Sequence, residues 1–93
     1  MRIQFIKNVH FTRLVKISGR NVKEFNFRKM RSDDEDIFSV DVSDDRGNRI
    51  MFQMKKDGNV WHIGNQALPS WIIEQEGRLN ELIEEELKLL GEG

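Results

Sequence analysis

Residues 68–90, LPSWIIEQEGRLNELIEEELKLL, form the only long helical pattern in the chain, and the short strand patterns before them need a cover. At about 100° per residue, their apolar side chains fall on one broad stripe, which predicts an amphipathic helix. The opposite side is rich in glutamate, as expected of a solvated helix face. Because such a helix would overhang strands of ordinary length, we expect Leu87, Leu89 and Leu90 to be partly exposed. We hypothesise that these three leucines form a homodimer contact.

Two residues are unusual for the middle of such a helix. Gly77 costs about 1 kcal/mol relative to alanine there, so it either permits close packing against the sheet or marks a kink. Glu86 lies inside the apolar stripe, which predicts that it sits where the helix leaves the core.

The residues before the helix alternate between apolar and polar, and turn signals separate the alternating runs. Asp57-Gly58 is the strongest hairpin signal, and Gly47 is placed for a positive φ in another hairpin loop. The predicted strands are residues 1–7, 11–17, 22–30, 37–42, 49–55 and 60–63. The fold class is therefore α+β: an antiparallel β-meander of four to six strands with one long C-terminal helix packed across one face. Residues 1–93 are expected to form a single domain.

Alternation along each strand assigns its side chains to one of two faces. The expected core is Phe5, Phe25, Phe27, Phe38, Val40, Val42, Ile50, Phe52, Met54, Trp61, Trp71, Ile72, Leu79 and Ile83. The face that the helix leaves uncovered is expected to carry Gln4, Asn26, Arg28, Ser39, Asp41, Met51, Gln53 and Lys55. Such a face is either ordinary solvated surface or a binding platform.

The charges are unevenly distributed along the chain. Residues 1–31 hold nine basic residues and one acidic residue, whereas residues 32–93 hold six basic and fifteen acidic residues. This asymmetry has three interpretations: an anionic partner for the basic part, head-to-tail self-association, or internal compensation across the sheet. An anionic partner such as single-stranded nucleic acid would be contacted through Arg13, Lys16, Arg20, Lys23, Arg28, Lys29 and Arg31.

The chemistry of common active sites is missing from the sequence. The chain has no cysteine, which excludes disulfides and thiolate metal sites, and it has neither a GxGxxG motif nor a P-loop. The acidic runs 33–36 and 44–47 lack the ligand spacing of an EF-hand. An enzyme would have to use His10 or His62 beside a carboxylate in a pocket. We therefore predict no enzymatic activity, no metal and no cofactor.

The location of the protein follows from two further patterns. No apolar run approaches the length of a membrane span, and the first residues, MRIQFIKN, lack the apolar core of a signal peptide. A cytoplasmic protein with no membrane partner is therefore the expectation.

Residues 19–42, GRNVKEFNFRKMRSDDEDIFSVDV, combine a basic turn, a Phe-x-Phe strand, a polar loop and another alternating strand. Followed by one long helix, this order resembles the repeat unit of the PUR-alpha and Whirly families and related single-strand-binding folds. The resemblance implies single-strand binding and a helix that takes part in dimerisation.

The sequence therefore predicts a small, non-enzymatic binding domain with two alternative functions. The first is binding of single-stranded nucleic acid through the basic N-terminal strands. The second is a protein–protein interaction module that acts through the open sheet face, an edge strand or the C-terminal helix.

Overall fold

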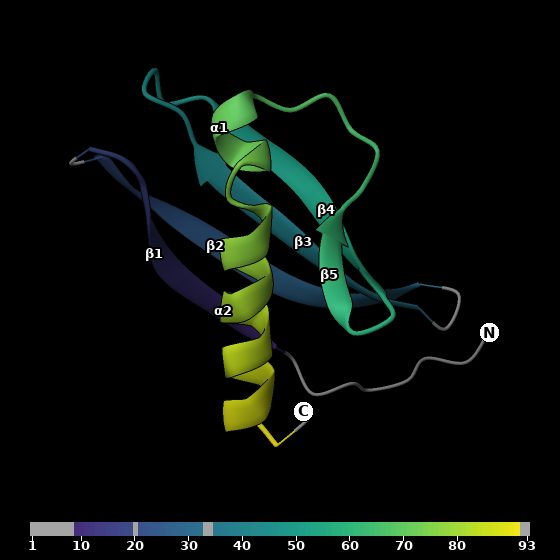
Figure 1. Ribbon diagram of the computed structural model, residues 1–93. Coiled ribbons are helices and arrows are strands. Elements are labelled where there is room, and N and C mark those ends of the chain that lie inside the picture. The colour runs from purple at the N-terminus through teal and green to yellow at the C-terminus, as the bar shows by residue number, and fades with distance from the viewer. Residues whose placement is uncertain (1–8, 20, 33–34, 92–93) are drawn as a thin grey trace.

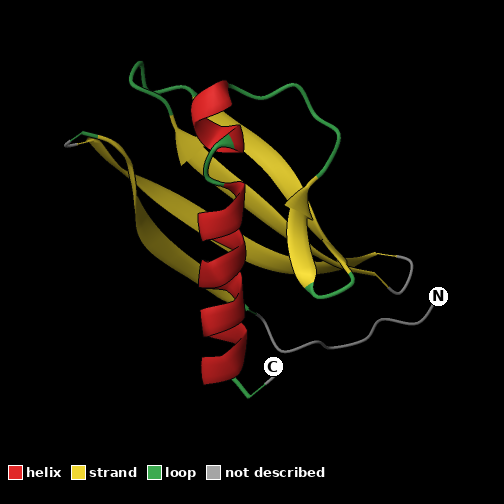
Figure 2. Cartoon of the chain, viewed as in Figure 1, coloured by secondary structure: helices red, strands yellow, loops and turns green. Residues whose placement is uncertain are grey.

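The sheet is a five-stranded antiparallel meander. The structure is a computed structural model, and it describes residues 9–19, 21–32 and 35–91. The strands are β1 (His10–Ser18), β2 (Asn21–Ser32), β3 (Glu35–Ser43), β4 (Arg49–Asp57) and β5 (Val60–Ile63), and each pairs with the next along the chain (Figure 1). Two helices follow, α1 (Ser70–Ile73) and α2 (Glu76–Leu89), and both lie on the same side of the sheet (Figure 2). The predicted α+β meander with a C-terminal helix is confirmed.

The predicted alternation holds across the described strands. Phe27 pairs with Val40, and Val40 pairs with Phe52, so that three buried side chains line up on the helix side. In the same registers, Arg28 lies opposite Ser39 and Ser39 lies opposite Gln53 on the other side. All the residues predicted for the open face lie on it, except Gln4, which falls outside the described residues together with Phe5 and the predicted strand 1–7.

The core lies between the sheet and the helices. Of the expected core residues, Ile50 and Trp71 are only half-buried, and the other described ones are buried. Phe11 packs in a stacked arrangement on Phe27, with 4.6 Å between ring centroids, and therefore belongs to the helix side. The residues that are buried without having been predicted are Val9, Val15, Ile37, Leu82 and Leu87.

The single long helix predicted for residues 68–90 is wrong in detail. The chain leaves helical geometry after α1 and resumes it in α2, with Gln75 at the N-cap position of α2 and a backbone φ of −93° and ψ of 2°. Gly77 lies in the first turn of α2, and no other part of the protein lies within 4 Å of where its Cβ would be. Gly77 therefore does not serve close packing on the sheet. In the described residues, no helix is long and apolar enough to cross a membrane.

The break shortens the helix and changes how its C-terminal leucines are placed. Leu87 is only 6% exposed, so the prediction that it is partly exposed is wrong. Leu89 is 79% exposed, and Leu90 is half-buried against the core. Glu86 is half-buried, at the edge of the apolar stripe. A helix of 14 residues is about 21 Å long, which is shorter than the single helix predicted for residues 68–90.

Two side chains of α2 bind the backbone of the edge strand β5. The Trp61 N–H donates to Asn80 Oδ1 at 2.8 Å, and the Ile63 N–H donates to Glu76 Oε2 at 2.8 Å. An exposed edge strand presents unpaired N–H groups to which another chain can pair. The helix therefore covers one face of the sheet and also satisfies part of one of its two edges.

Replacing Asn80 with alanine is expected to lower the free energy of unfolding by about 1–2 kcal/mol, because the partly buried N–H of Trp61 loses its acceptor. Urea unfolding measures the loss, and faster hydrogen exchange of the Trp61 amide locates it. Glu81→Ala is the control, because Glu81 is an exposed neighbour whose change is expected to stay within about 0.5 kcal/mol. Equal losses in the two variants would contradict the role given to Asn80.

Candidate functional site

The described basic residues of the N-terminal third do not lie on one surface. Alternation places Arg13, Lys23, Lys29 and Arg31 on the side of the sheet that carries the helices, whereas Lys16 and Arg28 lie on the open face. Arg20, the seventh candidate for a phosphate contact, falls outside the described residues. The structure therefore separates the predicted site into two groups on opposite faces.

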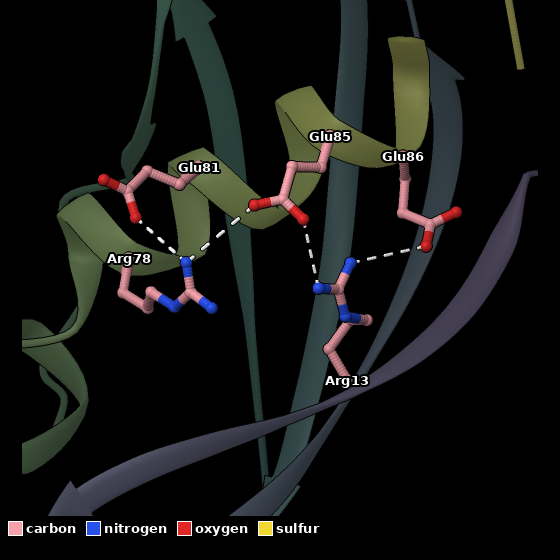
Figure 3. Close-up of polar contacts among 5 residues, drawn as sticks. All are labelled: Arg13, Arg78, Glu81, Glu85 and Glu86. Atoms are coloured by element: carbon pink, nitrogen blue, oxygen red, sulfur yellow. Dashed lines mark hydrogen bonds and ion pairs between the residues drawn. The ribbon is translucent and has the colours of Figure 1, made fainter. Parts of the chain in front are cut away.

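Arg13 joins β1 to α2 through two carboxylates (Figure 3). Its Nη2 lies 3.1 Å from Glu85 Oε1, and its Nη1 lies 3.5 Å from Glu86 Oε1. The other carboxylate oxygen of Glu85 lies 3.9 Å from Arg78, which also contacts Glu81 at 3.0 Å. Arg13 is therefore part of an intramolecular ion-pair network.

The other three helix-side cations also face acids of the same chain. Lys23 pairs with Asp45, in the loop between β3 and β4. Asp36 of β3 forms ion pairs with both Lys29, at 3.9 Å, and Arg31, at 3.4 Å. All of these acids come from the acidic part of the sequence, after residue 31. The geometry therefore supports internal compensation for this group of basic residues.

The two predicted cations on the open face differ from the helix-side group in their contacts. Lys16 and Arg28 are exposed, and neither forms an ion pair with any described residue. The neighbouring Arg49 lies 3.9 Å from Asp41, whose Oδ1 also accepts a hydrogen bond of 2.9 Å from Asn26 Nδ2. Among the described basic residues of the predicted site, Lys16 and Arg28 are thus the two without an ion pair to another described residue.

A shallow hollow of about 300 Å³ lies on the open face, and we call it the open-face hollow. It is lined by His10, Asn26, Phe27, Arg28, Met30, Ser39, Asp41, Arg49 and Met51. Asn26 and Asp41 supply its polar floor: Asn26 accepts a hydrogen bond of 2.7 Å from the neighbouring Thr12 and donates one to Asp41. A second hollow of about 410 Å³ shares Asn26 and Arg49 with it and extends the depression toward Val22 and Ser43.

Exposed apolar side chains accompany these hollows. Leu14 is 68% exposed and Met51 is 64% exposed, and Val22 and Met30 are also exposed. All four side chains point away from the helices, because their alternation places them on the open face. The open face therefore combines apolar contacts, hydrogen-bonding groups and unpaired positive charge.

A further hollow of about 330 Å³ lies where the β1–β2 turn meets α1 and the β3–β4 loop. Trp71 of α1 contributes to it, and Lys23 Nζ lies 5.6 Å from the centre of the Trp71 ring. Lys23 and Arg46 are balanced here by Asp44 and Asp45, so the hollow has no excess charge. We do not assign it a ligand.

The two histidines do not form a catalytic arrangement with the described residues. His62 Nδ1 lies 3.6 Å from Glu76 Oε2, but both side chains are more than one-third exposed, and Glu76 already accepts from Ile63. His10 and Asp41 both line the open-face hollow, yet no hydrogen bond joins them. Within the described ranges, no three His, Asp or Glu side chains converge to hold a metal ion.

Comparison of the chain with protein-family models, with curated proteins and with solved structures found no match. The order of strands and helix is the only basis for the likeness to the PUR-alpha and Whirly folds.

Sequence reasoning missed three features of the site: the open-face hollow, the hydrogen bonds on the open face, and the separation of the basic residues between two faces. The hollow lined by Met30 and Met51 has no sequence signature, because its depth depends on how neighbouring strands twist. The hydrogen bonds of Thr12, Asn26 and Asp41 follow from the strand register, which the sequence did not define. The alternation of β2 did contain one usable signal: it separates Arg28 from Lys29 and so already places neighbouring cations on opposite faces.

Arg13→Gln is expected to lower the free energy of unfolding by about 0.5–1 kcal/mol at low salt, because it removes the partly exposed pairs to Glu85 and Glu86. The loss should shrink in 1 M salt, where screening acts over about 3 Å. Chemical denaturation at two salt concentrations measures both effects. Lys16→Gln, on the same strand but without an ion pair, is the control and should be near neutral. A Lys16 effect as large as that of Arg13 would contradict this division of the basic residues.

Asp44 organises the β3–β4 loop, and its pKa is lowered from the ordinary value of 3.8, first by the hydrogen bond from the Asn48 backbone N–H. A carboxyl group whose pKa is lower in the folded protein stabilises the fold at pH values above its unfolded-state pKa. This stability is lost as the pH falls through its folded-state pKa. Asp44→Ala should therefore be less stable than the wild type at neutral pH, and the difference should disappear in acid. Thermal unfolding from pH 7 to pH 2 measures it. Asp44→Asn, which keeps an acceptor without a titrating charge, should lack this pH dependence.

Proposed function

We propose that the protein is a non-enzymatic interaction domain that binds an acidic, partly apolar polypeptide segment on the open face of its sheet. The observation that carries the proposal is the open-face hollow, where Met30 and Met51 flank a polar floor and Arg28 has no ion partner among the described residues. The proposal takes up the second of the two functions that the sequence predicts.

The methionines favour a polypeptide partner. Methionine is flexible and polarisable, and it is common at surfaces that adapt to different protein partners. Met51 is 64% exposed, and Leu14 and Val22 extend the apolar character toward β1. A partner side chain placed between Met30 and Met51 would remove both from water, at about 25 cal/mol per Å² of buried apolar surface.

The charges favour an acidic partner. Lys16 and Arg28 form no ion pair with a described carboxylate. Glu24 also lies on the open face, opposite Leu14, and Asp41 is engaged by Asn26 and lies near Arg49. Arginine presents a fork of donors that fits a carboxylate in a bidentate geometry. An aspartate or glutamate beside a large apolar residue is therefore the chemistry that this face would recognise.

Binding of single-stranded nucleic acid is the second candidate, and the unpaired Lys16 and Arg28 favour it. Single-strand binders usually combine such charges with aromatic side chains on which bases stack. In the described strands, the phenylalanine and tryptophan side chains point to the helix side, so the open face offers no stacking platform there. The polypeptide partner therefore fits the open face better.

Peptides selected by phage display on the wild-type domain are expected to combine an acidic residue with a large apolar one. Arg28→Glu and Met51→Asp should each weaken a selected peptide at least about tenfold, or about 1.4 kcal/mol, because they remove its charge partner or its apolar contact. Fluorescence polarisation measures the affinities. Lys88→Glu, a charge reversal on the exposed side of α2, is the matched control and should bind as the wild type does.

Two results would contradict the proposal. Peptides that bind Arg28→Glu and Met51→Asp as tightly as the wild type would show that the open face is not the binding surface. The second result concerns a mixed-sequence single-stranded oligonucleotide. Nucleic-acid binding would be supported instead if this oligonucleotide shifts the amide resonances of Lys16 and Arg28, if its affinity falls steeply as salt rises, and if no selected peptide competes with it.

A further inference from the structure

The edge of β1 is unpaired among the described strands. The Lys29 N–H donates to the Val9 carbonyl at 2.9 Å, and the register from His10 to Lys16 continues this antiparallel pairing. In such a ladder, residues alternate between those that bond to the neighbouring strand and those that do not. The odd-numbered residues therefore bond to β2. The backbone N–H and C=O groups of His10, Thr12, Leu14 and Lys16 point away from the sheet.

The two edges of the sheet differ in availability. On β5, the Trp61 and Ile63 N–H groups are held by Asn80 and Glu76 of α2. A β5 edge occupied in this way cannot accept the β1 strand of another copy, so head-to-tail extension of the sheet is blocked. Among the described strands, pairing of β1 with β1 therefore remains, which is a twofold arrangement that closes after two subunits.

We propose that two copies of this chain associate by antiparallel pairing of their β1 strands about a twofold axis at Leu14. This inference rests on the strand edges and is independent of the proposed function. The two sheets would become one continuous sheet, with both open faces on the same side. The proposal replaces the helix contact through Leu87, Leu89 and Leu90, because Leu87 is buried and Leu90 is half-buried in the monomer.

The register follows from strand length and charge. Leu14 is the middle residue of β1 (His10–Ser18), so pairing about Leu14 uses the full length of both strands. On the open face, Leu14 would lie against the partner subunit's Leu14, and Thr12 against the partner subunit's Lys16. On the helix side, Arg13 would lie against the partner subunit's Val15, and no like charges would be directly opposed.

A twofold register centred on residue 13 is less favourable. Moving the axis to residue 13 would place Arg13 directly against the partner subunit's Arg13, and like charges directly opposite each other destabilise a sheet. It would also leave each Leu14 against a threonine instead of a leucine. The register centred on Leu14 therefore places the 68% exposed Leu14 against an apolar side chain, the partner subunit's Leu14.

Two features make the association reversible. A register shift between Lys16 and Ser18 bends the end of β1, and bulges of this kind limit edge-to-edge pairing. A single strand pair also buries less surface than the roughly 1,200 Å² at which stable interfaces begin. We therefore expect a concentration-dependent dimer rather than an obligate one.

Sedimentation velocity of the full chain, up to about 1 mM, is expected to show a reversible shift from monomer to dimer, in the concentration range where weak interfaces operate. Leu14→Asp should raise the dimer dissociation constant at least about tenfold, because it places two like charges at the twofold axis. Leu89→Asp, at a leucine that is exposed to a similar degree on α2, should dimerise as the wild type does. Circular dichroism confirms that both variants are folded.

A cysteine variant tests the register directly, because the chain contains no cysteine. Directly opposed, hydrogen-bonded residues of antiparallel strands have Cα atoms about 5.5 Å apart, which is within the range that a disulfide spans. Leu14→Cys should therefore form a covalent dimer under mild oxidation much faster than Leu89→Cys. A monomer at 1 mM, a dimer that Leu14→Asp leaves intact, or loss of the dimer in Leu89→Asp would each overturn the proposal.

Discussion

A five-stranded open sheet has two faces and two edges, and this chain has one main helix with which to cover them. The helix α2 covers one face, through the buried stripe of Leu79, Leu82, Ile83 and Leu87, and it reaches one edge through Asn80 and Glu76. The other face and the β1 edge stay uncovered by any described element. The candidate binding surfaces of the protein follow from this limited cover.

The distribution of charge depends on the same division. The sum over residues 1–31 indicates a strongly basic segment, but β-strand alternation directs four of its six described candidates toward helix-side acids and leaves the other two exposed on the open face. Arg13 is held by Glu85 and Glu86, whereas Lys16, three residues further along, has no such partner. Exposed ion pairs contribute little to stability. Their larger consequence here is that they reduce the positive charge that a partner would meet on the helix side.

The sequence was sufficient for the fold class, the positions of the described strands along the chain and most of the core, because strand alternation and hairpin signals are local. The order of the strands in the sheet came from the structure. The predicted β5 matches the observed Val60–Ile63, and the other described strands extend at most two residues beyond either predicted end. The helix break at Gln75 lies two residues before Gly77, where the sequence left a kink as one of two alternatives, but its position was not predicted. Leu87 was misplaced because the overhang argument assumed an unbroken helix. The ion pairs and the open-face hollow depend on tertiary geometry, which periodicity does not contain.

The open face and the β1 edge share residues, and this sharing connects the two proposals. Lys16 contributes charge to the open face through its side chain and hydrogen-bonding groups to the edge through its backbone. Pairing of two β1 strands would use the backbone groups and leave both Lys16 ammonium groups on the open side. A dimer would then present two open-face hollows on one continuous sheet, so a partner with two acidic segments would bind its second segment at a raised effective concentration. Weak self-association could thus increase affinity for a bivalent partner without any new contact between a single subunit and its ligand.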